Sequence, residues 1–149
     1  MIYNRTIADV RRAVQLRKSK VEKGRELTDA EKQLMERGFF TINTANRIES
    51  KQAELNRLFE EMGYYGANVE TKEWNLGDVF LQQDLARLCE NASKLKRAFF
   101  VYATTPYDAM PKFFFWETNL LEKILYDLEK MQEFVATNYQ ECGAVECGG

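Results

Sequence analysis

The sequence predicts an all-α protein, a helical bundle of three long helices plus two short N-terminal helices. Apolar residues recur at the helical period along most of the 149 residues, and 45% of the residues are hydrophobic, enough to form a core. The only two prolines, Pro106 and Pro111, bracket a single loop. The only strand-like segment, residues 99–103, is one short strand, which cannot form a sheet alone.

The two short helices are expected between residues 6 and 38, because each has a capping-box start and a glycine stop. These signals are Thr6, Asp9 and Gly24 for the first helix, and Thr28, Glu31 and Gly38 for the second. The first helix also has an apolar stripe whose spacing is that of a packing helix. The stripe consists of Ile7, Val10, Val14 and Val21.

The three long helices are expected over about residues 44–62, 81–99 and 113–139. When Arg47, Arg87 and Lys123 are aligned, the helices carry apolar residues at the same offsets, so we expect them to pack together. The aligned residues are Ala45, Leu85 and Leu121; Ile48, Leu88 and Ile124; Leu55, Leu95 and Met131; and Phe59, Phe99 and Val135. The last helix adds Leu125 and Leu128 to its core-facing set.

Aromatic residues gather in the loops that precede the last two helices. They are candidates for plugs at the ends of the bundle or for anchors of a protein interface, and we favour plugs over an interface, and an interface over a small-molecule site. Trp74 is expected to be a packing anchor, with Gly77 and Asp78 as the stop and cap that direct the next helix. The candidates are Tyr64, Tyr65, Trp74, Tyr107, Phe114 and Trp116.

Residues 1–139 are expected to form a single helical domain, followed by a flexible Gly/Cys tail at 140–149. Cys142 and Cys147 in this tail could pair or bind metal, although two thiols without a histidine make a poor zinc site. Cys89 falls within the fourth helix and is expected to be a buried structural thiol. Three cysteines form no disulfide framework, which fits a reducing compartment.

The charge is unevenly distributed although its total is only −2. Residues 1–25 have eight basic and two acidic side chains, whereas residues 103–149 have eight acidic and three basic ones. The basic segment could bind nucleic acid, but we favour pairing of the two ends, within one chain or between subunits. No apolar signal segment and no 18-residue apolar run occurs, so we expect synthesis in a cytoplasm and no membrane association.

The chain contains no histidine, which removes the common nucleophilic and general-base systems. Phosphate-binding glycine motifs and calcium loops are also absent, so we expect no enzyme activity, no cofactor and no metal. Carboxylates could still supply an acid/base pair, but on amphipathic helices we interpret them as a solvated face. These carboxylates are Glu60, Glu61, Glu117, Glu122, Asp127 and Glu133.

Several motifs occur in a characteristic order over residues 3–135. They are "YNRTIADV" (3–10), "LTDAEKQLMERG" (27–38), "NTANRIE" (43–49), "TKEWNLGDVFLQQDLARLCENASKLK" (71–96), and "VYATTPYDAMP" with "NLLEKILYDLEKM" (101–131). Together they resemble a helical module of phage and prophage tail, tail-fibre and baseplate proteins of Gram-positive gut bacteria. The sequence departs from that module at Phe80, where the module has a proline, and at Ala45, where it has an aliphatic residue.

The resemblance implies a structural protein of the virion, synthesised in the bacterial host cytoplasm. Its implied partners are copies of itself, as a homo-oligomer, and neighbouring phage structural proteins. No catalytic residue is implied, because the shared motifs hold folding positions. The alternative is a small cytoplasmic regulatory or adaptor protein that binds a protein or nucleic acid through its basic N-terminal helix.

Overall fold

The computed structural model describes residues 1–144, with side chains described for residues 1–22 and 24–138. Over these residues the protein is all-helical, with five helices and no strand, which confirms the predicted fold class. The helices are α1 (Ile7–Lys23), α2 (Asp29–Gly38), α3 (Ile42–Glu61), α4 (Gln82–Ala98) and α5 (Phe115–Ala144). No described helix is long and apolar enough to cross a membrane.

Local signals place the ends of the first two helices where the sequence predicts them. Thr6 and Asp9 form a complete capping box at the start of α1, and Gly24 ends that helix in the left-handed conformation, with φ of 61°. A second capping box, formed by Thr28 and Glu31, begins α2.

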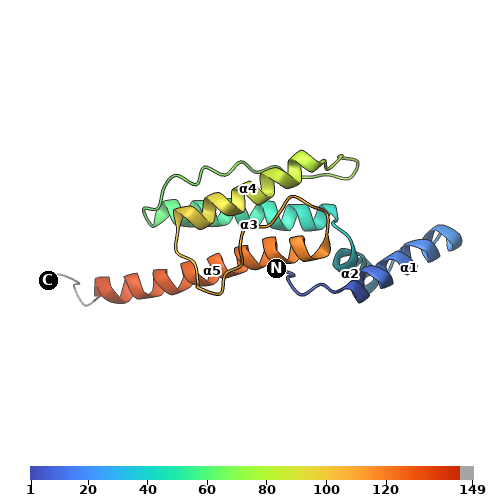
Figure 1. Cartoon of the computed structure of the whole chain (residues 1–149), viewed down its shortest axis with the longest axis horizontal. Coiled ribbons are helices and arrows are strands. Elements are labelled where there is room, and N and C mark those ends of the chain that lie inside the picture. The colour runs from blue at the N-terminus through green and yellow to red at the C-terminus, as the bar shows by residue number, and fades with distance from the viewer. Residues whose placement is uncertain (145–149) are drawn as a thin grey trace.

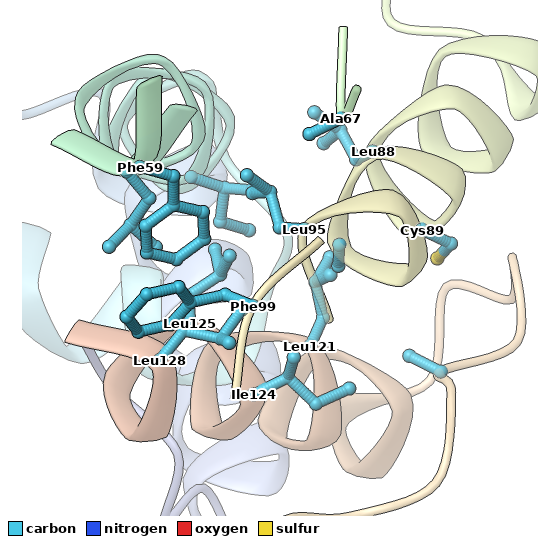
Figure 2. Packing of buried hydrophobic residues seen from close by; sticks show 14 of the residues in the cluster. Phe59, Ala67, Leu88, Cys89, Leu95, Phe99, Leu121, Ile124, Leu125 and Leu128 are labelled. Atoms are coloured by element: carbon cyan, nitrogen blue, oxygen red, sulfur yellow. The ribbon is translucent and has the colours of Figure 1, made fainter. Parts of the chain in front are cut away.

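Helices α3, α4 and α5 enclose the hydrophobic core (Figure 2). At its centre the rings of Phe59 from α3 and Phe99, which follows α4, are stacked with centroids 4.3 Å apart. The aligned apolar positions are buried on all three helices, apart from Met131 and Val135, which are half-buried at the core edge. The alignment of Arg47, Arg87 and Lys123 therefore identified the packed face of each helix.

The packing of α1 differs from the expectation. Its predicted apolar stripe is largely solvent-exposed, with Val21 79% and Val14 37% exposed. Instead α1 presents a small residue, the fully buried Ala13, to Gly38 of α2. Close approach of two helices requires small residues at the contact, so this pairing turns the larger valines outward. At 17 residues α1 is also as long as α4, so only α2, with 10 residues, is a short helix.

The molecule is elongated, with different elements at its two ends (Figure 1). Helices α1 and α2 lie at one end, and the C-terminal turns of α5 extend past α3 and α4 at the other. Helix α5 includes residues 140–144, the first part of the predicted tail. The remainder of that tail, with Cys147, and the side chain of Cys142 lie outside the described residues.

Gly38→Ala tests the contact between α1 and α2. A Cβ at this position would lie 2.1 Å from Cβ of Ala13 and 2.8 Å from the Asp9 carbonyl oxygen. Alanine ordinarily stabilises a helix by up to about 1 kcal/mol relative to glycine. Here we expect the opposite sign, a loss of about 1 to 3 kcal/mol in the free energy of unfolding, measured by urea denaturation.

Gln15→Ala on the exposed side of α1 is the control, with an expected change within about 0.5 kcal/mol. Stabilisation by Gly38→Ala would contradict the close approach of the two helices.

Candidate functional site

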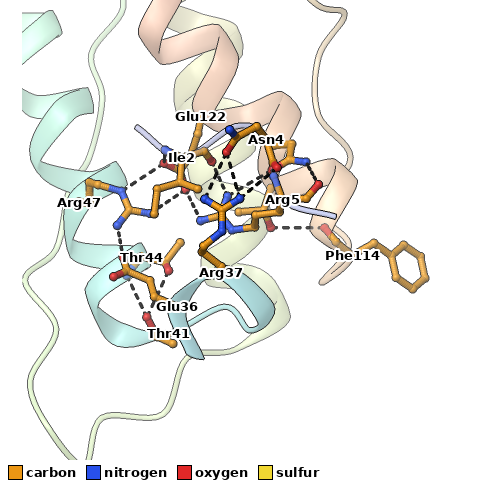
Figure 3. Close-up of polar contacts among 12 residues, drawn as sticks. Ile2, Asn4, Arg5, Glu36, Arg37, Thr41, Thr44, Arg47, Phe114 and Glu122 are labelled. Carbon is orange, nitrogen blue, oxygen red and sulfur yellow. Dashed lines mark hydrogen bonds and ion pairs between the residues drawn. The ribbon is translucent and has the colours of Figure 1, made fainter. Parts of the chain in front are cut away.

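One buried carboxylate fastens the N-terminal segment to the core helices. Glu122 of α5 has no exposed surface, and its oxygens accept hydrogen bonds from the Ile2 N–H at 2.6 Å, from Arg5 Nη2 at 2.6 Å and from Arg47 Nη2 at 2.8 Å. Asn119 adds two bonds of 3.0 Å to the N–H and carbonyl of Arg5. This Glu122 cluster joins residues 2–5, α3 and α5 (Figure 3).

The same cluster also positions α2 and α1. Arg47 forms a second ion pair with Glu36 of α2. Arg37, which lies between Glu36 and Gly38, binds Asp9 of α1 with an N–O distance of 3.3 Å. Burial acts to raise the pKa of Asp9, but hydrogen bonds from Arg37 and Thr6 outweigh it and hold that pKa below its usual value.

This arrangement leaves an apolar surface facing solvent along α1 and the start of α5. We define the outer surface as Ile7, Val14, Val21, Phe39, Phe113, Phe114 and Trp116. All of these side chains are exposed except the half-buried Phe39, and the rings of Phe114 and Trp116 are stacked 4.5 Å apart. Figure 3 shows the Phe114 ring directed away from the Glu122 cluster.

Two grooves run along this outer surface. One, of about 440 Å³, lies between the start of α1, Phe40 and the segment Phe113 to Trp116. The other, of about 380 Å³, lies farther along α1 between Val14, Val21 and Phe39, with Arg17 and Lys18 at its rim. Phe39 lines both grooves, so the two are adjacent. Such an apolar surface with basic edges can bury the apolar face of a protein partner.

Two of the six candidate aromatics are packed into the fold. Trp74 is only 3% exposed, and its indole N–H donates to Glu49 at 3.1 Å. Its backbone N–H and carbonyl both bond to the Asn46 side chain at 2.8 Å, which fastens the long loop to α3. Tyr64 is half-buried, with its ring edge-on to Phe99 at 5.0 Å.

The end-plug interpretation is wrong for the other four candidates. Tyr65 and Tyr107 are exposed, Tyr107 by 93%, and they contribute to neither groove. Phe114 and Trp116 are exposed on the outer surface. The buried side chains Thr118 and Glu122 set the inward side of α5, and Trp116, two positions before Thr118, therefore points outward. Phe114 precedes the first residue of α5, so it is not held to that face.

Sequence reasoning missed Phe80, which the structure places between the packed and exposed aromatics. Its ring lies 4.8 Å from Trp74, 4.9 Å from Phe40 and 5.9 Å from Phe113. A continuous row of aromatic rings therefore connects the buried Trp74 to the outer surface at Phe113. In the sequence, the one sign of this role was that Phe80 stands where the phage module has a proline.

The solvated-face interpretation of the carboxylates is wrong for Glu122 and Asp127, which are 0% and 4% exposed. Both are paired with basic side chains, Asp127 with Lys123 at 2.6 Å. Paired carboxylates of this kind hold structure. Among the described residues no group of three or more His, Cys, Asp or Glu side chains is placed to hold a metal ion.

Five basic side chains also lie on the exposed surface of α1. Arg11, Arg12, Arg17, Lys18 and Lys20 are exposed. None of these five forms an ion pair within the part of the chain that the structure describes.

Comparisons with protein-family models, curated proteins and solved structures find no match for this chain.

Glu122→Gln tests the buried cluster. The substitution would leave the guanidinium of Arg5, whose side chain is nearly inaccessible, without its counter-charge. We expect a loss of about 3 to 5 kcal/mol in the free energy of unfolding, measured by urea denaturation.

Glu133→Gln is the matched control, because Glu133 forms an exposed pair with Lys130 at 3.0 Å. Its expected cost is at most about 1 kcal/mol. Equal effects of the two substitutions would show that Glu122 does not hold the fold together.

Cys89 provides a separate test of burial. Burial, with smaller contributions from Glu117 and Asp108, raises the pKa of its thiol to about 12. Because the thiolate is the reactive form, we expect Cys89 to resist alkylation at neutral pH in the folded protein and to react after unfolding. Peptide mass mapping distinguishes it from the other cysteines, and equal labelling in both states would contradict its burial.

Proposed function

We propose that this protein is a structural component of a phage or prophage virion, associated with the tail, baseplate or fibre, and that it acts by protein–protein assembly. The observation that supports this best is the outer surface, a continuous apolar strip along α1 and the start of α5. Its partners would be copies of itself and neighbouring phage structural proteins. Synthesis would take place in the host cytoplasm, before incorporation into the virion, and no catalysis is required.

In this proposal the fold is a bundle of three long helices, α3 to α5, that presents α1 and α2 as a fixed projection. The charged and polar contacts of Glu122, Arg47 and Arg37 hold that projection in place. Pre-organisation lowers the entropy lost on binding, because the partner meets a surface that is already ordered. The order of sequence motifs over residues 3–135 supports the same class of protein.

The composition of the outer surface favours a protein partner. Trp, Phe and Arg are enriched at protein interfaces, and Phe114 and Trp116 line one groove of this surface while Arg17 lines the other. Exposed apolar patches of this kind mark interaction sites on otherwise charged proteins.

The alternative is a small regulatory or adaptor protein that binds protein or nucleic acid through α1. The five exposed basic side chains of α1 favour it, because they form no ion pair among the described residues. Against nucleic acid, α1 alternates these charges with exposed valines and has no aromatic residue for base stacking.

Light scattering across a salt titration distinguishes the two functions. We expect an oligomer that persists at high salt, because burial of apolar surface supplies its affinity. Replacing Val14 and Val21 together with serine should reduce the mass toward that of one chain. Leu76→Ser is the control, because Leu76 is 97% exposed and lies outside the outer surface.

A monomeric wild-type chain that binds DNA with a steep salt dependence would overturn the proposed function and support the alternative.

A further inference from the structure

The groove beside Val14 and Val21 has features that specify its occupant. Its floor is apolar, and two basic side chains, Arg17 and Lys18, and one acidic side chain, Glu22, line the rim. Over its whole length α1 has six basic and two acidic residues, a net charge of +4. An occupant therefore needs an exposed apolar side chain next to acidic ones.

The C-terminal half of α5 has these complementary features. At 30 residues α5 would span about 45 Å, against about 30 Å for the 20 residues of α3, and its last turns pass the end of the bundle (Figure 1). Phe134 in this half of α5 is 59% exposed, and Glu133 beside it is also exposed. Residues 130–144, the C-terminal half, contain two acidic residues and one basic residue.

These two surfaces cannot meet within one chain, because they lie at opposite ends of the molecule (Figure 1). Pairing α1 with α1 of a second copy would bring two helices of net charge +4 together, which opposes a symmetric contact. Pairing α1 with the end of α5 joins opposite charges instead.

We propose that the α1 groove of one copy binds the C-terminal half of α5 from the next copy. This inference rests on the proposed function and names the partner of its surface. Phe134 enters the groove between Val14 and Val21, and Glu133 faces Arg17 or Lys18. Glu133 exchanges its pairing with Lys130 for this contact at little cost, because exposed ion pairs contribute little.

This contact is heterologous, because each copy uses one surface as donor and another as acceptor. Repeated contacts of this type close into a ring when the rotation between copies permits and otherwise produce a filament. Apolar burial supplies the affinity, and the charges select the orientation and raise the association rate.

Complementation between two assembly-deficient variants tests the proposal. Val21→Glu disables the groove and leaves the end of α5 intact, whereas Phe134→Glu does the reverse. Both side chains are mainly exposed, so folding should be retained, as circular dichroism would check. Each variant alone should self-associate about tenfold to a hundredfold more weakly than the wild-type chain, as expected for loss of an interface anchor.

Mixed in equal amounts, the two variants should form a complex of two chains that does not grow further, because only one intact groove and one intact α5 end remain per pair. Light scattering measures this mass. Leu76→Glu is the matched control for each single variant, and on its own it should assemble like the wild-type chain.

Each other result overturns the proposal. If Phe134→Glu assembles normally, or if the mixture stays monomeric while the wild-type chain assembles, the partner is wrong but the proposed function stands. A wild-type chain that stays monomeric overturns the inference, and one that also binds DNA in a salt-sensitive manner overturns the proposed function as well.

Discussion

A carboxylate that is removed from water must be paired and fully hydrogen-bonded to remain charged, and Glu122 of α5 meets this requirement with groups from the N-terminal segment and from α3. The N-terminal residues Ile2 and Arg5 cannot leave α5 without exposing this site, and Arg47 cannot leave without unpairing it. Because leaving the buried charge unpaired would be unfavourable, the N-terminal segment, α3 and α5 must keep this arrangement. Because Arg47 also holds Glu36, the constraint extends to α2.

The position of α1 follows from that constraint together with one steric requirement. Gly38 allows the backbone of α2 to approach Ala13, and Arg37 holds Asp9 beside it. With its small residues used for this contact, α1 leaves Val14 and Val21 in solvent. The apolar surface proposed for assembly is therefore a product of the packing.

Local signals in the sequence were sufficient for the ends of the first two helices but not for the start of α4 or for the surroundings of the helices. The predicted cap Asp78 is wrong, because Asp78 accepts from the Asn75 N–H and α4 begins after Leu81. The capping pair of Thr6 and Asp9 acts over three residues, and so it could be read directly from the sequence. The apolar period of Val14 and Val21 identified a face of α1 but could not show whether the same chain covers it. Glu122 looked like a surface residue, because its partner Arg5 is 117 positions away and the periodicity of a helix gives no information on such a distant contact. Phe80 was visible only as a departure from a motif.

Hydrogen exchange of the wild-type chain at low and high protein concentration tests the head-to-tail assembly most directly. We expect the amides of α1 around Val14 to Val21 and those of α5 around Phe134 to become more protected together as concentration rises. The exposed loop at residues 75–79 should show no change. Protection of only one of the two surfaces, or of neither, would contradict the proposed assembly.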